Sequence, residues 1–526
     1  MQGLLVLGLL MLGWLPLGGP AGGRAGLSTA CAEAAPDDLP ALRRLLRDPS
    51  PSARASAYRR LSGSAAPEVL ALLQQGLSDA HPYVRRAVAG VLGTLDDPRA
   101  RQRIAAEAPR WRSELARREA CQAYVLWLDP AGEAGLAAAA RDPAPSVRIE
   151  ALRWLADDPA PAARELLRAA AADPDPAVRA EAWAAWPSAG AAGPVGAGVP
   201  AGEPPPPLAP ALADADARVR LAALEVLVAQ GAAGGAAGAA EGVAAALGDA
   251  SWSVRLAAAA CAGRVRSRAV LAPLVGALAD PRVRVAEAAG AALLALTGLP
   301  FESDARAWRT WLEGDGRSFD PAQLPEGAGA RPLPPPAGTR TVEARFLGLT
   351  IRSRHVAFVL DASGSMGSLT RDGRTRWEGV VDELERALAA LGGAHVNLAV
   401  FHERVEAALP RALPLDSVRR EALLRFVRAR RPAGRTALYD GIAWGLSDPE
   451  VDTLVVLSDG APSAGQWFTK TDLRAELLRA NRFRRARIDV VAVGAEDIAR
   501  RWRDALEQVA SDSGGSYVAR PPGPAR

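Results

Sequence analysis

The sequence is almost without lysine and histidine, and both shortages exclude classes of enzyme. Lys470 is the single lysine and no glycine-rich loop precedes it, so neither a P-loop nor a kinase lysine is available. The four histidines are scattered. Ser365 does not lie in a Gly-x-Ser-x-Gly nucleophile elbow, because Ser363 occupies the position of the first glycine. These absences predict a protein that is not an enzyme.

Cysteine is equally scarce. The three cysteines, Cys31, Cys121 and Cys261, have neither the spacing of a zinc site nor the pattern of a disulfide framework. Cys121 and Cys261 lie among alanine, valine and leucine in helical patterns. We therefore expect both to be small buried side chains without a disulfide.

Long apolar runs are missing except at the N-terminus. Residues 4–17 form an apolar stretch too short for a comfortable membrane span, and Gly/Pro/Ala-rich sequence with Ala-Cys-Ala at 30–32 follows. This resembles a secretory signal peptide, predicted over residues 1–32. We expect an extracytoplasmic protein of bacterial type (periplasmic, cell-envelope or secreted) without a membrane span in the mature chain. A lipid anchor on Cys31 is disfavoured, because Ser28 stands where a lipobox has an aliphatic residue.

No strong charge excess is present either. The formal net charge is only +4, and no basic block with interleaved aromatic residues occurs, which argues against nucleic acid as a partner. With 49% hydrophobic and 23% charged residues the chain is globular, and its 526 residues predict more than one domain.

Between residues 38 and 312 the sequence repeats itself. An apolar helix, an aspartate, a turn and a Val-Arg segment leading into a second helix recur with a period of 31 or 32 residues in the series Arg54, Arg85, Arg117, Arg148 and Arg179. Arg220, Arg255 and Arg284 continue the series more loosely. An aspartate six residues before the arginine recurs in the pairs Asp48/Arg54, Asp79/Arg85, Asp142/Arg148, Asp173/Arg179, Asp214/Arg220 and Asp249/Arg255. Eight such units predict an all-α solenoid of helix pairs.

The turn residues indicate where each unit bends. Side chains able to cap the second helix stand at its start, often beside proline, at Ser50, Asp175, Asp216 and Ser251. The units resemble short HEAT repeats of the bilin-lyase-like type, in which the aspartate and the arginine hydrogen-bond between neighbouring repeats. The resemblance implies a structural role for these pairs.

The same pairs allow one specific expectation. We expect that loss of Arg148 leaves Asp142 without its partner.

A histidine–glutamate iron site, as in one enzymatic HEAT family, does not fit, because the repeats contain only His81.

Three further segments divide the chain. Residues 188–207 are rich in glycine, alanine and proline and cannot form a packed helix pair, so they predict a loop or hinge within the array. Trp308 and Trp311 fall on one helical face and are expected to cover the open end of the solenoid. Residues 313–339, which are proline-rich in their later part, then predict a linker to a second domain over 340–520.

The most informative motif lies near the start of this second domain. Residues 356–361 are a short apolar run, typical of a strand buried on both faces, and the run ends in Asp361-x-Ser363-x-Ser365. Open α/β sheets bind ligands at the carboxyl ends of their strands. One carboxylate and two hydroxyls on one loop suit a hard cation such as Mg²⁺.

Two further oxygen-bearing side chains follow in matching positions. Thr436 lies in a loop before a helix, and a second buried strand over 451–457 leads to Asp459. With these motifs the segment resembles a von Willebrand factor type A (vWA) domain with a metal-ion-dependent adhesion site (MIDAS). The resemblance implies a doubly wound, Rossmann-like α/β fold and a partner carboxylate that completes the coordination. It also implies a cation, Mg²⁺ or alternatively Mn²⁺ or Ca²⁺, bound by Asp361, Ser363, Ser365, Thr436 and Asp459.

Helix capping and a phosphotransferase site fit these residues less well. Strand-end aspartate and serine can cap helices, but capping does not account for a second strand-end aspartate together with a loop threonine. Haloacid-dehalogenase-like phosphotransferases need a second aspartate where this chain has Ser363. They also need a lysine before the last acidic motif, whereas Lys470 follows Asp459.

The sequence therefore predicts a HEAT-repeat solenoid followed by a vWA domain. The leading hypothesis is a metal-dependent adhesion protein whose vWA domain recognises an acidic group of a protein partner through the MIDAS cation. The second is a structural or assembly scaffold whose ion only stabilises the loops, for example an adaptor for an ATPase partner in the cytoplasm. A bilin-handling lyase is a third class, supported by the repeat resemblance alone.

Overall fold

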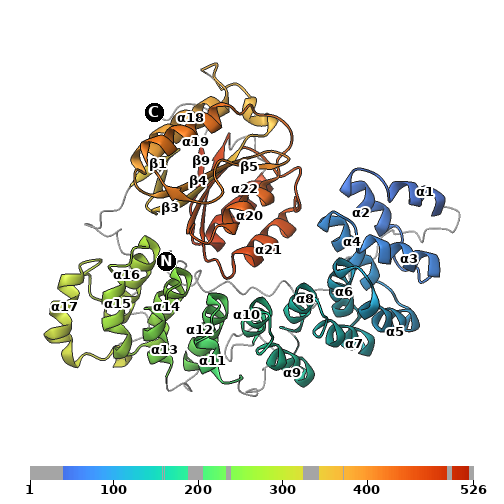
Figure 1. Cartoon of the computed structure of the whole chain (residues 1–526), viewed down its shortest axis with the longest axis horizontal. Coiled ribbons are helices and arrows are strands. Elements are labelled where there is room, and N and C mark those ends of the chain that lie inside the picture. Colours follow the sequence, from blue (N-terminus) through green and yellow to red (C-terminus); the bar gives the residue numbers. More distant parts are fainter. Residues whose placement is uncertain are drawn as a thin grey trace. The chain divides into compact units, whose positions relative to one another are not determined.

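The computed structural model describes residues 39–156, 158, 160–186, 205–232, 238–323, 343–370, 372–494 and 500–520 (Figure 1). The predicted signal peptide with Cys31, most of the predicted break at 188–207 and residues 324–339 of the predicted linker lie outside these described residues. The chain divides into two compact units, one within residues 16–239 and one that contains residues 240–526. In the described part, no helix is both long and apolar enough to cross a membrane.

The first unit consists of helix pairs, in agreement with the repeat period. Ser50 caps α2 by accepting from the Ala53 N–H, and Asp175 caps α10 by accepting from the Ala177 N–H. The second helices of successive repeats, α2, α4, α6, α8, α10 and α12, pack against one another in order. The helices are α1 (Leu39–Leu45), α2 (Pro51–Arg59), α3 (Pro67–Gly76), α4 (Pro82–Gly93), α5 (Pro98–Glu107), α6 (Glu114–Trp127), α7 (Pro130–Ala139), α8 (Pro145–Leu155), α9 (Pro161–Ala170), α10 (Pro176–Ala185), α11 (Leu208–Leu212) and α12 (Ala217–Ala232).

Arginine–aspartate pairs connect these repeats. Arg54 donates to both carboxylate oxygens of Asp79 at 2.8 Å and to the main-chain oxygen of Asp48 in its own repeat at 2.8 Å. Three further pairs show the same pattern: Arg117 with Asp142, Arg148 with Asp173, and Arg179 with Asp214. Each guanidinium thus binds the main chain of one repeat and the carboxylate of the next, which fixes how neighbouring repeats stack.

The structure corrects the expected partner of Arg148. Asp142 accepts from Arg117 Nε at 2.7 Å, whereas Arg148 donates to Asp173 at 2.7 and 2.8 Å. Arg148 reaches Asp142 only at its main-chain oxygen, at 2.8 Å. A spacing of six residues places the aspartate and the arginine around one turn, and from there the long guanidinium side chain extends to the next repeat.

Replacing Arg148 by alanine should lower the free energy of unfolding by about 1–3 kcal/mol, because the largely buried Asp173 carboxylate loses its bidentate partner. Urea unfolding of the full chain, followed by circular dichroism, measures this. Arg43→Ala is the matched control, since its ion pair with Glu68 is 56% and 67% exposed and should contribute little. Equal effects of both substitutions would contradict the structural role of the pairs.

The second unit begins with the last repeats. They comprise α13 (Ala239–Ala246), α14 (Trp252–Val265), α15 (Leu271–Ala277), α16 (Val283–Thr297) and α17 (Ala305–Glu313). Trp308 is fully buried and contacts Trp311 with ring centroids 5.9 Å apart, so these aromatic residues cover the end of the array as predicted. Ser251, in contrast, does not cap α14 with its side chain, because its hydroxyl bonds to Ser253 instead.

The two remaining cysteines behave as predicted. Cys121 in α6 and Cys261 in α14 are buried and free of disulfides. Burial raises the pKa of the Cys261 thiol to about 11, so it stays protonated and packs as a small apolar side chain.

The rest of the second unit is a doubly wound α/β fold. Its seven-stranded sheet has the order β5-β4-β3-β7-β8-β9, with β6 beside β4, and β1 and β2 form a separate hairpin. Strands β3, β4, β7, β8 and β9 run parallel, whereas β5 and β6 pair with β4 antiparallel. The elements are β1 (Ala344–Phe346), β2 (Leu349–Ile351), β3 (His355–Asp361), α18 (Arg376–Ala390), β4 (His395–Phe401), β5 (Val405–Ala407), β6 (Leu413–Pro414), α19 (Ser417–Arg428), α20 (Leu438–Ser447), β7 (Thr453–Ser458), α21 (Lys470–Asn481), β8 (Arg487–Val493), α22 (Arg500–Asp512) and β9 (Tyr517–Arg520).

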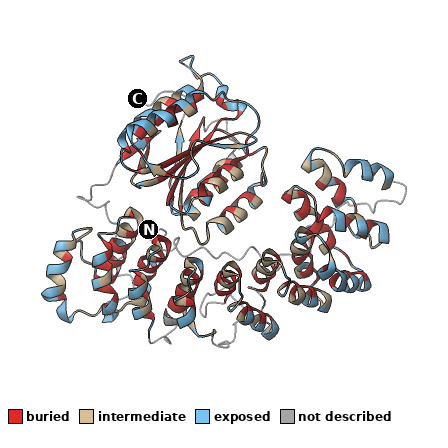
Figure 2. Ribbon diagram, in the orientation of Figure 1, coloured by how far each residue is buried: buried red, intermediate tan, exposed pale blue. Residues whose placement is uncertain are grey.

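Strand β3 lies inside this sheet and is buried on both faces (Figure 2). Phe358 and Leu360 pack with α18 and α19, whereas Ala357 and Val359 pack with α20, α21 and α22. From β3 the chain goes to β4 on one side and then to β7 on the other. The carboxyl end of β3 is therefore a topological switch point, where such sheets bind ligands. The predicted fold class, a HEAT solenoid followed by a doubly wound α/β domain, is confirmed.

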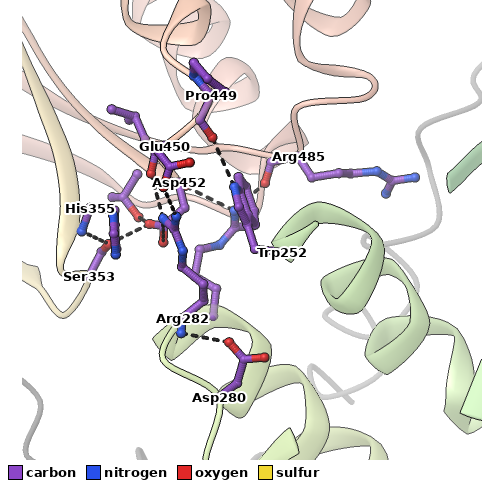
Figure 3. Close-up of polar contacts among 12 residues, drawn as sticks. Trp252, Asp280, Arg282, Ser353, His355, Pro449, Glu450, Asp452 and Arg485 are labelled. Carbon is purple, nitrogen blue, oxygen red and sulfur yellow. Dashed lines mark hydrogen bonds and ion pairs between the residues drawn. The ribbon is translucent and has the colours of Figure 1, made fainter. Parts of the chain in front are cut away.

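Within the second unit, the last repeats contact the amino end of the sheet (Figure 3). Arg282 is 7% exposed and donates to the main-chain and side-chain oxygens of Glu450 at 2.6 and 2.5 Å. It also lies 3.5 Å from the buried Asp452 carboxylate. The Trp252 indole donates to the main-chain oxygen of Pro449 at 3.2 Å. We call this set of bonds the amino-end contact.

Arg284 belongs to this contact and not to the series of interrepeat pairs, where the sequence placed it. Arg255 completes the pattern with Asp280, at 2.6 and 3.1 Å, but the position six residues after Asp280 is Ala286. Arg284 instead donates to the main-chain oxygen of Asp452 at 3.1 Å.

His355, at the start of β3, has a strongly depressed pKa. Burial, assisted by the nearby Arg282 guanidinium, lowers the pKa of His355 to about 4, although the carboxylates of Asp452 and Glu450 act in the opposite direction. The ring stacks on His395 with centroids 4.7 Å apart. His355 is therefore neutral near pH 7.

Acidification should destabilise the fold through His355. Its pKa of about 4 in the folded chain lies below the unfolded value of about 6.5. The stability that it contributes is therefore fully present above about pH 6.5 and is lost as the pH falls through about 4. Thermal unfolding of the full chain should be measured at pH 7 and pH 4. The unfolding temperature should fall less between these two pH values for His355→Gln than for the wild type. His402→Gln is the control, because this side chain is 30% exposed. Its unfolding temperature should fall as much as that of the wild type.

Candidate metal centre

The candidate metal centre lies at the carboxyl ends of β3 and β7. Strand β3 ends at Asp361 and β7 ends at Ser458, directly before Asp459. The two strands are parallel and pair Leu360 with Leu457, so their ends meet at one edge of the sheet. The Asp361 and Asp459 residues are 0% and 3% exposed.

Asp361 is fixed by hydrogen bonds from its own loop and from β7. Its Oδ1 accepts from the Ser363 N–H at 2.9 Å and its Oδ2 accepts from the Ser458 hydroxyl at 2.7 Å. Burial raises the pKa of Asp361 to about 6, opposed by the hydrogen bonds from Ser363 and Ser458 and assisted by the Asp459 carboxylate. A cation bound here would favour the charged form of this buried carboxylate.

Ser363, Ser365 and Asp459 form a chain of hydrogen bonds. The hydroxyls of Ser363 and Ser365 lie 3.1 Å apart, and the Ser365 hydroxyl donates to Asp459 Oδ1 at 2.7 Å. A short 3-10 turn over Gly364–Gly367 follows Ser363 and carries Ser365. The structure thus brings together four of the five predicted residues.

Thr436, the fifth residue, reaches the same edge through its loop. The Gly364 N–H donates to the Gly434 oxygen at 3.1 Å and the Ala433 N–H to the Ala362 oxygen at 2.9 Å, so the Thr436 loop runs beside the Asp361 loop. Thr436 is 5% exposed, and in the described part of the chain its hydroxyl has no hydrogen-bond partner. A nearly buried hydroxyl in this situation is suited to bind a cation.

Two residues of the centre were not identified from the sequence. Ser458 could have been found, because it directly precedes Asp459 at the end of a buried strand. Arg376 lies 83 positions before Asp459 and no local motif marks it, yet its Nη1 is 3.0 Å from Asp459 Oδ2.

The donor set fits a small, hard divalent cation. Carboxylate and hydroxyl oxygens suit Mg²⁺ or Mn²⁺ better than a soft metal. Among the described residues, no group of three or more histidine, cysteine, aspartate and glutamate side chains could hold a metal. Any cation at this edge therefore depends on the hydroxyls of Ser363, Ser365 and Thr436 together with the two carboxylates.

The helical part of the chain is similar to a known family. The family model of HEAT repeats matches residues 39–124, 133–188 and 205–295, which confirms the predicted repeats. No curated protein matches the sequence.

Solved structures similar to the chain include several with a type A domain or an adhesive role in their description. A von Willebrand factor type A protein from Catenulispora acidiphila is 21% identical, with 32% of this chain and 39% of that chain covered and a TM-score of 0.28. The pilus adhesin SpaC from Lactobacillus rhamnosus GG is 15% identical, with 31% and 28% covered and a TM-score of 0.26.

A third similar structure is described with a metal. Proximal thread matrix protein 1 from the mussel byssus, with a zinc-occupied MIDAS motif, is 14% identical, with 32% and 43% covered and a TM-score of 0.25. The similarity spans less than half of each of these three proteins' own length. At such identities the likeness concerns the fold alone.

Proposed function

We propose that this chain is a metal-dependent protein-binding protein in which HEAT repeats carry a vWA domain that recognises an acidic group of a partner. The cation would be bound by the predicted residues Asp361, Ser363, Ser365, Thr436 and Asp459. The main support is the hydrogen-bonded chain from Ser363 through Ser365 to Asp459. On the neighbouring loop, the Thr436 hydroxyl has no hydrogen-bond partner among the described residues. More generally, the HEAT repeats and the vWA-like fold indicate a protein-interaction scaffold.

Mg²⁺ is the cation that we propose, with Mn²⁺ or Ca²⁺ as substitutes. Three of the five donors are neutral hydroxyls, so the bound ion keeps much of its positive charge and attracts an outside anion. A carboxylate from another protein is the ligand that fits this demand. We place the protein outside the cytoplasm because of the predicted signal peptide, and we propose no catalytic role.

The second candidate function is a scaffold whose ion only stabilises the loops, such as an adaptor for an ATPase partner. One observation favours it: Asp361, Ser363 and Asp459 are at most 3% exposed, so their side chains are hardly accessible to a partner. Ser365, in contrast, is exposed, and the Thr436 hydroxyl has no hydrogen-bond partner in the described residues, which favours an accessible ion. The two functions differ in whether partner binding depends on the metal.

Asp361→Ala should abolish binding of Mg²⁺, because the remaining hydroxyls and a single carboxylate are too weak to hold the ion. Isothermal titration calorimetry with Mg²⁺ on the full chain measures this. Asp372→Ala removes an exposed aspartate from the segment between Ser365 and α18 and should leave the affinity unchanged. Equal Mg²⁺ affinity of Asp361→Ala and the wild type would contradict the assignment of the site.

Partner binding should disappear with EDTA and return with Mg²⁺ or Mn²⁺. Thr436→Ala should abolish it too, because this change removes one ligand from a loop while leaving both strands intact. Affinity purification from the cell-envelope fraction, with and without chelator, measures both effects. Thr350→Ala on β2 is the matched control and should bind normally. A partner that is retained under EDTA and by Thr436→Ala would favour the scaffold function.

A further inference from the structure

We infer that Arg376 is a built-in counter-ion that sets the charge of the metal centre, lowering its affinity for the cation and raising the affinity of the loaded centre for a carboxylate. This inference rests on the proposed function. It assigns a role to a residue outside the five predicted ligands, and it specifies why the partner group should carry a negative charge.

The main chain of Arg376 is held firmly at the start of α18. Thr375 and Glu378 form a capping box: the Thr375 hydroxyl accepts from the Glu378 N–H at 3.2 Å, and the Glu378 carboxylate accepts from the Thr375 N–H at 2.7 Å. The Arg376 N–H donates to the main-chain oxygen of Ser368 at 3.0 Å. The residue is thereby tied to the segment that follows the Ser363 and Ser365 hydroxyls.

The guanidinium of Arg376 is equally well placed. Its Nη1 lies 3.0 Å from Asp459 Oδ2, and the two side chains are only 9% and 0% exposed. On another side it packs against Gly494 at the end of β8, where a Cβ would stand 2.7 Å from Arg376 Cζ. The positive φ of 64° at Gly494 also favours glycine. The guanidinium therefore occupies a fitted space and not a solvent-exposed position.

This pairing divides the two oxygens of Asp459 between two tasks. Oδ1 accepts from the Ser365 hydroxyl at 2.7 Å, which connects it with the proposed ligands, whereas Oδ2 is paired with Arg376. Arg376 therefore compensates the charge of Asp459 without occupying the oxygen that faces the serines.

The formal charges then determine what the centre attracts. Among the described residues of the centre, Asp361 and Asp459 contribute two negative formal charges and Arg376 contributes one positive formal charge. A divalent cation changes the net charge from minus one to plus one, and one carboxylate from a partner brings it to zero. If Arg376 were uncharged, the loaded centre would already be neutral and would attract a carboxylate less strongly.

Arg376→Gln tests this in the full chain. Calorimetry should show Mg²⁺ binding about tenfold tighter than in the wild type, because a like charge near the cation has been removed. Acetate then serves as the carboxylate probe: its binding to the Mn²⁺-loaded protein, followed by water-proton relaxation, should weaken about tenfold. Arg376→Lys keeps the charge and should stay close to the wild type in both measurements. Arg374→Gln, which removes a half-exposed pair with Asp382 on the same segment, should change neither.

A double variant separates charge from packing. Arg376→Gln combined with Asp459→Asn should bind Mg²⁺ more tightly than Asp459→Asn alone, because the two proteins lack the same carboxylate and differ only in the guanidinium charge. Thermal unfolding in EDTA verifies that each variant is folded. If Arg376→Gln is unstable because the Asp459 carboxylate has lost its partner, the double variant avoids this problem, because it lacks that carboxylate.

The outcomes are distinguishable. Mg²⁺ binding by Arg376→Gln that equals or is weaker than that of the wild type overturns the inference and leaves the proposed function standing. A double variant that binds Mg²⁺ no more tightly than Asp459→Asn alone overturns it as well. Mg²⁺ binding by Arg376→Gln but not by the wild type overturns the proposed function and with it the inference, because the guanidinium would then exclude the metal from the native centre. Failure of both proteins to bind Mg²⁺ overturns the proposed function and the inference together.

Discussion

Buried pairs of arginine and carboxylate are the interaction on which this structure depends. All but one of the 63 basic residues are arginine, which is always charged and presents a planar set of donors that matches both oxygens of a carboxylate. Between repeats Arg148 binds both oxygens of Asp173. At the amino-end contact Arg282 approaches one oxygen of Asp452, and at the candidate metal centre Arg376 approaches one oxygen of Asp459. In the bidentate pairs between repeats, a lysine could not replace the arginine without losing one of the two bonds.

Strand β3 connects the amino-end contact with the candidate metal centre. Its first residue, His355, lies at the amino-end contact, and its last, Asp361, lies at the candidate metal centre. The strand is buried on both faces between the two layers of helices, so its ends are held by packing as well as by hydrogen bonds. The last repeats therefore support the α/β domain at the edge of the sheet opposite to the proposed cation. The proposed site for the partner is left free of this contact.

The candidate metal centre contains little net negative charge. Two buried carboxylates are accompanied by a buried guanidinium, and the other proposed donors are hydroxyls. A centre with several unpaired carboxylates would hold a divalent cation more strongly but would leave it little attraction for an outside anion. The proposed recognition of a carboxylate needs a cation that keeps positive charge for an outside anion, and the low net negative charge of these residues fits that need.

The sequence alone determined the fold class, the HEAT repeats and the set of candidate ligands. Repeat period, strand-end motifs and turn residues are local patterns, and local hydrogen bonding and burial follow from them directly, as at Asp175 and Asp361. Only the tertiary structure decided which distant side chains meet. Spacing suggested that Arg148 pairs with Asp142 and that Arg284 continues the interrepeat pairs, but the arginine side chain is long enough to reach another element, and packing selects which one. Arg376 meets Asp459 for the same reason: the end of β7, the start of α18 and Gly494 converge there only when the sheet has formed.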